Sequence, residues 1–376
     1  MLKVALVHDY IKEYCGAERV LETLHEIWPE APVFTTVYLP EFLGPHKHRF
    51  DGWNIRTSWL QNIPYIHKLV SPARVLTPWI FDNFDLSEYD VIIVSATGAY
   101  FPNLLVRKPE TVHICYCHTP PRYLYGYPTA REWKKNVIVR IAGELMNHWL
   151  RQVDFLSYQR PDYIVANSNE VGKRVQKFYR RETTVIYPPV GLVDKLSSYQ
   201  AIKQKKSRYY LTGGRLARAK HIDLAIEACN KLKLPLKVFG REFAGYGDEL
   251  RQNAGPTIEF VGEVTDAELS KLYMNAKALI YPSELEDFGI MPVEAQMYGI
   301  PVIAYRSGGV KETIIDGKTG VFFDELTVES LIEAIKRLSY RAIKPEDCID
   351  NAEKFGKERF KSEIKEFIKT KYAGTT

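Results

Sequence analysis

The stretch RYYLTGGRLARAKHIDLAIEACNKLKLPLKVFG, residues 208–240, decides the fold that we expect for this protein. It begins with a short apolar run that ends in two glycines, continues with an amphipathic segment and closes on a second short apolar run. A strand, a helix and a second strand in this order form a βαβ unit with parallel strands. The alternation continues to about residue 305, so the sequence predicts a doubly wound α/β sheet here.

The first half of the chain carries the same alternation. Short, mostly apolar runs predict buried parallel strands at residues 2–8, 91–96, 111–117 and 162–168. Amphipathic segments predict helices at residues 17–28, 131–153 and 169–179. The chain is therefore expected to contain two α/β units in tandem.

Between these units lies the sequence IYPPVGL, residues 186–192, followed by a polar run at 197–207. Consecutive prolines stiffen the chain, and a polar run is typical of a linker. We therefore expect an N-terminal Rossmann-like domain at 1–190, a second at 191–345 and a C-terminal helix at 346–376 that crosses back to the first. Because ligands of open α/β sheets bind outside the carboxyl ends of the strands, the two domains are expected to face each other across a cleft.

Charge and cysteine content narrow the class of protein. The formal charge of +5 comes without the long basic runs of a nucleic-acid-binding protein. Five scattered cysteines are too few for a disulfide framework, and Cys115 and Cys117 are spaced for neither a zinc site nor a redox pair. The first residues lack a signal-peptide core, and no stretch reaches the ~20 apolar residues of a membrane span. The sequence therefore predicts a cytoplasmic protein that is not integral to a membrane.

Two cations follow the first strand of the second unit. Gly213 and Gly214 end the apolar run, Arg215 follows at once and Lys220 lies five residues later. Cations at the carboxyl end of a strand can clamp a diphosphate and stabilise the charge on a leaving group. A solvated basic turn is the alternative interpretation.

The segment SELEDFGIMPVEA, residues 283–295, places Glu286 eight residues before Glu294. Pro292 suits the first position of a helix, which would put Glu294 in the first turn and Glu286 in the preceding loop. Both carboxylates can then face one cavity, and the backbone N–H groups of residues 288–291 are available to a phosphate or a hydroxyl. The alternative is that Glu294 only favours the helix dipole.

Two features of the first unit follow predicted strands in the same way. His118 comes directly after a strand and precedes two prolines, at the edge where an α/β sheet presents side chains to its cleft. Gly16 follows Cys15 at the start of a helix, where free N–H groups can face an anion. A structural histidine and a plain strand-to-helix turn are the alternatives. No D-x-D sequence and no clustered Cys or His set indicates a metal site.

The helix predicted at residues 131–153 combines a row of apolar residues with five cations and two glutamates. The cations are Arg131, Lys134, Lys135, Arg140 and Arg151. Such a helix suits the head groups of anionic lipids, and an ordinary amphipathic helix of the domain is the alternative.

Taken in order, these motifs resemble glycosyltransferase family four. The resemblance spans nearly the whole chain and is carried by GAER, VANSNEVGKRV, VIYPPV, GRLARAK and EDFGIMPVEAQMYGIPVIAYRSGGVKETI. The family has the GT-B fold of two Rossmann-like domains and transfers sugars from nucleotide donors with retention. CHTPPRYLY and the EDFGI form of the motif are similar to the mannosyltransferase branch that builds O-antigen and related surface polysaccharides.

The resemblance implies a role for each matched position. Catalytic roles fall to His118, Arg215, Lys220 and Glu286. The donor site adds Gly16, Gly214, Val264, Phe288, Gly289, Ile290 and Glu294. In this scheme the two cations hold the diphosphate, Glu286 binds sugar hydroxyls and Glu294 binds the ribose. The strand end before Val264 receives the base.

Two positions depart from the family pattern. The pair Cys15-Gly16 stands where the first loop usually has two glycines, and Asp287 stands where glycine is commoner in the family, although the mannosyltransferase branch often has aspartate. Retention without paired catalytic carboxylates disfavours a double displacement. The resemblance implies a front-face substitution in which the leaving phosphate oxygen takes the acceptor's proton, with cations and helix dipoles in place of a metal. No cofactor and no metal is expected.

The branch resemblance implies GDP-mannose as the donor and a glycan or lipid-linked saccharide as the acceptor, with a UDP-sugar as the next candidate donor. No nucleic-acid partner is expected, and contact with the inner face of the cell membrane stays open through the helix at 131–153. Two other functions stay open as well, namely a sugar-nucleotide epimerase of the same fold and a non-catalytic nucleotide-sugar-binding protein.

Overall fold

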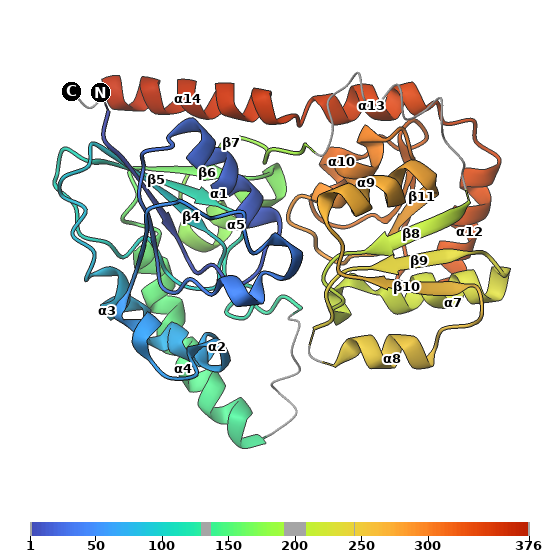
Figure 1. Ribbon diagram of the computed structural model, residues 1–376, viewed down its shortest axis with the longest axis horizontal. Helices are drawn as coiled ribbons and strands as arrows, with labels where there is room; N and C mark the ends of the chain where they lie inside the picture. The colour runs from blue at the N-terminus through green and yellow to red at the C-terminus, as the bar shows by residue number, and fades with distance from the viewer. Residues whose placement is uncertain (1, 129–136, 192–207, 244, 375–376) are drawn as a thin grey trace. The chain divides into compact units, whose positions relative to one another are not determined.

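The computed structural model describes the chain except residues 1, 129–136, 192–207, 244 and 375–376. Two compact units divide the chain. The first comprises Met1–Tyr127, Glu132–Pro189 and Lys357–Thr376, and the second comprises Pro128–Arg131 and Val190–Gly356. Each unit contains a parallel sheet with helices on its faces (Figure 1), which confirms the predicted fold class. The polar run expected at 197–207 lies outside the described residues, as do Arg131, Lys134 and Lys135.

The first unit contains a seven-stranded sheet in the order β3-β2-β1-β4-β5-β6-β7. Its strands are β1 (Val4–His8), β2 (Val33–Thr35), β3 (Ile55–Thr57), β4 (Val91–Ala96), β5 (Val112–Cys117), β6 (Tyr163–Ala166) and β7 (Thr184–Val185). Its α-helices are α1 (Gly16–Ile27), α2 (Ile66–Leu69), α3 (Thr77–Phe81), α4 (Val137–Ser157), α5 (Asn169–Tyr179) and α14 (Lys357–Ala373).

Successive strand residues of this sheet face two separate cores. Leu6 of β1 packs in the core that α1 and α14 cover, and its neighbour Val7 packs in the core that α3 and α5 cover. This alternation is the period of two expected of a strand buried on both faces. The Ser168 hydroxyl accepts the N–H of Val171 at 3.1 Å and caps α5.

The sequence did not reveal β2, β3 and β7. These strands have three, three and two residues, and all three lie near the edges of the sheet. So short a run shows no period, and a strand near an edge is less apolar, so pattern reasoning has little to detect.

The second unit contains a six-stranded parallel sheet in the order β10-β9-β8-β11-β12-β13. Its strands are β8 (Tyr209–Gly213), β9 (Leu236–Phe239), β10 (Ile258–Gly262), β11 (Ala276–Tyr281), β12 (Val302–Tyr305) and β13 (Gly320–Phe323). Its α-helices are α7 (Ile222–Leu232), α8 (Tyr246–Gln252), α9 (Asp266–Asn275), α10 (Ile290–Met297), α11 (Val310–Thr313), α12 (Val328–Ser339) and α13 (Pro345–Glu353). The helices α7, α8 and α12 cover one core of this sheet.

The C-terminal segment differs from the single helix expected at residues 346–376. It forms two helices, because α13 ends at Glu353 and α14 begins at Lys357. The helix α13 belongs to the second unit, where the Asn351 amide donates to Gln296 of α10 at 2.8 Å. The helix α14 belongs to the first unit, where Phe360 is buried in the core beside α1.

The strand order of each sheet reverses once. In the first sheet the reversal lies between β1 and β4, and in the second it lies between β8 and β11. A reversal of this kind opens a crevice at the carboxyl ends of the two strands, where ligands of α/β proteins bind. Most of the residues singled out from the sequence lie in the segments that follow these strands or β5, and Val264 follows the edge strand β10.

Candidate functional site

The candidate donor site lies at the carboxyl edge of the second sheet. The strands β8 and β11 run parallel, with Leu211 beside Leu279, so their carboxyl ends meet at one edge. β8 ends at Gly213 and β11 ends at Tyr281. The cations that follow the first strand and the glutamate that follows the second therefore start from adjacent positions.

Glycines let the backbones at this edge approach closely. A Cβ atom at Gly240 would lie 1.8 Å from the carbonyl oxygen of Gly214, and one at Gly213 would lie 2.3 Å from that of Phe239. Gly214 itself has a φ of 101°, which few other residues adopt. This packing fixes the turn that leads from β8 to Arg215.

Lys220 and Glu286 meet directly in this site. The Nζ atom of Lys220 lies 2.5 Å from Oε2 of Glu286 and 3.3 Å from the Tyr281 hydroxyl. The same carboxylate oxygen accepts the Tyr281 hydroxyl at 2.8 Å and the Ser283 hydroxyl at 2.6 Å. One oxygen thus accepts three hydrogen bonds, so the orientation of the carboxylate is fixed before any ligand arrives.

Tyr281 and Ser283 were not singled out from the sequence. Tyr281 is the last residue of β11, and Ser283 follows two residues later. A signal was available, since polar residues at the carboxyl end of a buried strand are placed to face a ligand. Without the structure, however, the sequence did not show that their hydroxyls converge on Glu286.

The loop that carries Glu286 is held by the segment Ser307–Gly308–Gly309. The Ser307 hydroxyl accepts the Leu285 N–H at 3.0 Å, and the Glu286 carbonyl accepts the Gly309 N–H at 2.8 Å. A Cβ atom at Gly308 would lie 2.1 Å from that carbonyl oxygen, so glycine is required at this contact. The loop is therefore anchored from its backbone while the Glu286 side chain lies in the site.

The helix after this loop begins earlier than the sequence suggested. Its N-cap is Gly289, with a φ of 91°, and Ile290 is its first residue, so Pro292 is the third. Proline is tolerated there because the first N–H groups of a helix have no acceptor within the helix. Glu294 is then the fifth helical residue, and its predicted place in the first turn is wrong.

Glu294 is nevertheless a buried polar residue of α10. Its side chain is 3 % exposed, and its Oε2 accepts the Tyr273 hydroxyl of α9 at 3.1 Å. The helix-dipole interpretation therefore does not account for its position. Phe288, just before the helix, packs its ring edge-on against Phe355 at 5.4 Å between centroids, so only its backbone is suited to contact a ligand.

Arg215 and Val264 lie in other loops that follow strands of the same sheet. The Arg215 guanidinium stands 5.5 Å from the centroid of the Phe243 ring. Val264 is half-buried in the turn between β10 and α9. The structure thus joins Lys220 to Glu286 and places Arg215 beside an aromatic ring.

His118 follows β5 in the first unit and is held by its backbone. Its N–H donates to the Ala96 carbonyl at 2.9 Å, and its carbonyl accepts the Asn167 amide at 2.9 Å. The Nε2 atom of its ring lies 2.9 Å from the Ser95 hydroxyl of β4. Burial, and to a lesser extent the nearby His8, lowers the pKa of His118 to about 3, so the ring is neutral at pH 7. Gly16 opens α1, on the segment after β1.

Asp9 also lies at the reversal point of the first sheet, although the sequence did not point to it. It follows β1 directly and is fully buried. Its Oδ2 accepts the N–H groups of Thr97 at 3.0 Å and Ala99 at 3.1 Å. Burial raises the pKa of this carboxyl group against these hydrogen bonds. Asp9 therefore ties the loop after β4 to the end of β1.

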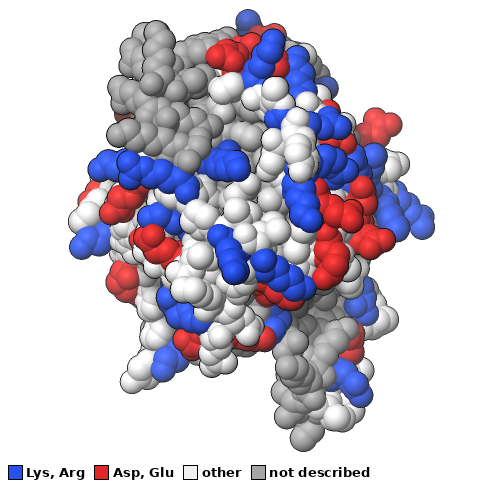
Figure 2. Space-filling view, turned by 90° about the vertical axis from the view of Figure 1, so that its right-hand side faces the viewer, with Lys and Arg blue, Asp and Glu red and all other residues white. Residues whose placement is uncertain are grey.

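Three further observations bear on the class of site. Within the described ranges, no group of three or more His, Cys, Asp or Glu side chains is placed to hold a metal ion. No helix in the described part of the chain is long and apolar enough to cross a bilayer. Cationic and anionic side chains are interspersed on the face shown in Figure 2, so the net charge is not gathered into one basic field there.

Two family models match consecutive parts of the chain. Residues 14–193 match Glycosyltransferase Family 4, and residues 196–355 match Glycosyl transferases group 1. The boundary between the two matches falls close to the division between the two units of the structure.

Individual relatives are more distant. The alpha-1,3/1,6-mannosyltransferase ALG2 of Kluyveromyces lactis is 26 % identical over 72 % of this chain and 58 % of its own length. The sulfoquinovosyl transferase SQD2 of Arabidopsis thaliana is 30 % identical over 88 % of this chain and 61 % of its own. The chain thus spans less than two thirds of either relative.

Among solved structures, Anabaena HepE in complex with UDP and glucose superposes with a TM-score of 0.70 at 18 % identity, over 98 % of this chain and all of that one. This likeness shows a shared fold of two Rossmann-like domains. The likeness therefore supports the GT-B fold, and the two family models show that the chain belongs to glycosyltransferase family 4.

Proposed function

We propose that this protein is a retaining hexosyltransferase that moves mannose from GDP-mannose to a hydroxyl of a glycan or lipid-linked saccharide in surface polysaccharide synthesis. The observation that carries the proposal is the contact between Lys220 and Glu286 where the second sheet reverses. It brings a cation suited to a diphosphate and a carboxylate suited to sugar hydroxyls into one site. The mannosyltransferase among the relatives favours mannose as the transferred sugar.

The carboxylate of Glu286 binds and orients the sugar in this scheme. Lys220, Tyr281 and Ser283 donate to its Oε2, which fixes the plane of the carboxylate. A carboxylate accepts several hydrogen bonds on its two oxygens, and sugar hydroxyls are donors of the kind that it accepts. Preorganised hydrogen bonds of this kind need no rearrangement during the reaction.

The leaving diphosphate is stabilised by positive charge from the protein. Arg215 and Lys220 supply cations, and the first N–H groups of α10 point from a helix N-terminus. The bond between the anomeric carbon and the phosphate oxygen breaks, and the acceptor oxygen forms the new bond on the same face. The acceptor's proton passes to the leaving phosphate oxygen, and the family resemblance assigns His118 a catalytic role. No metal is required, because the cations and N–H groups carry out the charge stabilisation.

The decisive experiment measures release of nucleoside diphosphate from GDP-mannose with and without a panel of glycan and lipid-linked acceptors. We expect GDP only when an acceptor is present, and an NMR spectrum of the product in which the anomeric configuration of the donor is retained. Consumption or isomerisation of the donor without an acceptor would identify an epimerase. Donor binding without turnover against every acceptor would identify a non-catalytic sensor. UDP-sugars belong in the same panel, because HepE, which shares the fold, was solved with UDP and glucose.

The helix α4 binds an anionic membrane surface, where the protein meets its acceptor. Ile141 and Leu145 of this helix are 58 % and 71 % exposed, and Trp149 continues their row one turn later. The opposite side of α4 is covered, since Leu150 and Asp154 are buried. Residues four apart share a helix face, so α4 presents a continuous apolar stripe to solvent. The helix α4 thus has apolar side chains on its exposed side, which packing within the domain does not require.

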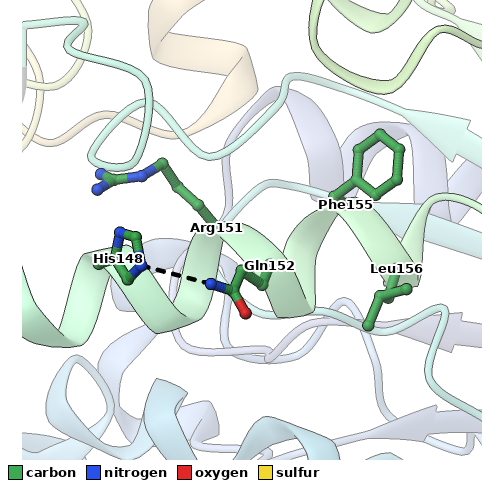
Figure 3. A pocket seen from close by; sticks show the side chains of 5 residues that line it. All are labelled: His148, Arg151, Gln152, Phe155 and Leu156. Atoms are coloured by element: carbon green, nitrogen blue, oxygen red, sulfur yellow. Dashed lines mark hydrogen bonds between the residues drawn. The ribbon is translucent and has the colours of Figure 1, made fainter.

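The surroundings of the stripe suit an anionic, interfacial partner. Trp79 of α3 is exposed and stacks on Trp149, with 6.2 Å between the ring centroids. Further along α4, Figure 3 shows a surface pocket whose lining side chains are His148, Arg151, Gln152, Phe155 and Leu156. Tryptophan at an apolar surface and a cation beside apolar side chains are typical of contact with lipid head groups.

Vesicle flotation tests this membrane contact separately from catalysis. We expect binding to vesicles that contain phosphatidylglycerol, weaker binding at high salt, and at least tenfold weaker binding of Ile141→Glu/Leu145→Glu. Tyr340→Glu is the matched control, because Tyr340 is 89 % exposed and belongs to the second unit. No binding of the unaltered protein contradicts the membrane contact. A dimer in solution that the double variant dissociates would show that a second copy covers the stripe instead.

A further inference from the structure

A row of four buried polar side chains runs through the first unit to His118. The Glu18 Oε1 atom of α1 lies 3.5 Å from Nε2 of His8, and the His8 Nδ1 atom lies 3.1 Å from the Ser95 hydroxyl. That hydroxyl in turn lies 2.9 Å from Nε2 of His118. All four side chains are less than a tenth exposed. The row links the first turn of α1 to the residue that follows β5.

With one proton on each of the two imidazole rings, the donor and acceptor groups in this row permit one direction of hydrogen bonding. The Glu18 carboxylate then accepts, which places the proton of His8 on Nε2. The Nδ1 atom of His8 is then an acceptor and takes the single proton of the Ser95 hydroxyl. The Ser95 oxygen is left to accept, so the Nε2 atom of His118 must carry a proton.

We propose that Glu18, acting through His8 and Ser95, fixes His118 as the tautomer with its proton on Nε2 and its lone pair on Nδ1. Glu18, His8 and Ser95 are positioning residues in this role, and only His118 carries the catalytic role proposed above. The low pKa of His118 supports the proposal, because a neutral ring has two tautomers to choose between. The consequence for turnover rests on the function proposed above, whereas the tautomer itself does not.

The variant Glu18→Gln reverses the direction of the row without removing a side chain. The Glu18 Oε2 atom also accepts the Cys15 N–H at 2.8 Å, as the N-terminal cap of α1. A glutamine keeps this bond only through its amide oxygen, which turns the amide NH₂ group toward His8. His8 must then carry its proton on Nδ1, Ser95 donates to His118, and the His118 proton moves to Nδ1. We expect turnover to fall about tenfold or more, as expected for a catalytic histidine held in the wrong tautomer.

The measurement is the ¹⁵N spectrum of the full chain labelled at histidine, recorded near pH 7.5, with His118→Gln used to assign the His118 signals. We expect a protonated Nε2 in the unaltered protein and a protonated Nδ1 in Glu18→Gln. Glu26→Gln is the matched control, since Glu26 lies on the same helix and pairs with Lys361 of α14 at 3.0 Å. Its His118 signals should equal those of the unaltered protein. A proton on Nδ1 in the unaltered protein, or no change in Glu18→Gln, overturns the proposal.

The variant Ser95→Ala tests whether the effect of residue 18 on the His118 tautomer depends on the Ser95 hydroxyl. With the hydroxyl removed, Glu18→Gln should leave the His118 spectrum as it is in Ser95→Ala alone. If Glu18→Gln still changes the His118 spectrum when Ser95 is alanine, residue 18 acts on His118 without the Ser95 hydroxyl, and the proposal is contradicted. If the tautomer changes in Glu18→Gln but turnover does not, the tautomer assignment stands and the catalytic role proposed for His118 fails.

Discussion

Glu286 is the residue at which the physical arguments converge. It lies in a loop before α10, and its Oε2 accepts three hydrogen bonds, one of them from the cation of Lys220. Removal of one partner leaves the carboxylate less firmly held but still bound by the others. Removal of Glu286 leaves a partly buried cation without its carboxylate, which is costly in a protein interior. The two members of the pair therefore differ in what their loss does to the fold.

Lys220→Ala should lower kcat by ~10²–10³-fold while the fold stays intact, because a cation aimed at the leaving group is lost. Arg215→Ala should act in the same direction for the same reason. The measurement is turnover of the donor with its acceptor, combined with a thermal unfolding curve for each variant.

Arg218→Ala is the control for both cations. Arg218 lies on the same turn as Lys220, but it is exposed and pairs with Glu249 at 2.6 Å. Its loss should leave kcat within about twofold, because exposed ion pairs contribute little. Equal losses in Arg218→Ala and Lys220→Ala would show that general charge, and not the placement of Lys220, matters. Near-normal turnover in Lys220→Ala and Arg215→Ala would contradict the role proposed for these two cations in stabilising the leaving diphosphate.

At the scale of elements, two loops and one helix form a single supported unit. The segment at residues 307–309 holds the Glu286 loop by its backbone, and that loop leads into α10. The helix α10 is fixed in turn by α13, through the amide of Asn351 on Gln296. Elements far from the ligand thus determine where the Glu286 carboxylate lies.

Gly308→Ala should disturb this support without touching a side chain of the site. Gly308 has a φ of 73°, and a Cβ atom there would lie 2.1 Å from the Glu286 carbonyl oxygen. We expect the free energy of unfolding to fall by about 2–4 kcal/mol, from backbone strain plus displacement of the loop. Turnover should fall as well, since the carboxylate moves with its backbone.

Gly52→Ala separates the two causes. Gly52 has a similar φ of 79°, but nothing lies within 4 Å of a Cβ atom placed there. It should show the strain alone, at about 1–2 kcal/mol, with unchanged turnover. Chemical denaturation of both variants measures the difference, and equal values would mean that the contact with Glu286 is not tight.

At the scale of the whole molecule, both units use one design. Each has a parallel sheet whose order reverses once, and each carries polar residues near the carboxyl ends of the strands at that reversal. His8, Ser95 and Asp9 occupy the first, and Lys220 and Glu286 occupy the second. The design explains how two sheets without sequence repeats both came to hold candidate sites.

Transfer should not depend on a divalent metal. In the proposed mechanism the charge stabilisation comes from cations and helix N–H groups. Activity measured after treatment with EDTA should remain within about twofold of the untreated protein. A complete loss that only Mg²⁺ or Mn²⁺ restores would contradict this prediction.

The sequence predicted most of the long elements but missed the helix α12 and several short elements. Runs such as residues 91–96 are apolar except for Ser95, and α5 carries both a polar cap and an apolar face, so each has a local signal. The strands β2, β3 and β7 have none, because they are defined by neighbours in the sheet. The start of α10 was misplaced by two residues because Pro292 is tolerated at more than one position of a first turn.

By itself, the sequence determined the two α/β units and the residue types placed after their strands. Local patterns encode these features, since burial sets the period of each element and glycines mark its turns. Only the tertiary structure decided that Lys220 and Glu286, 66 residues apart, share one oxygen, and that α4 leaves an apolar stripe uncovered. The physical reason is that such contacts depend on which strands lie side by side and which helix faces are packed, and no local pattern records either.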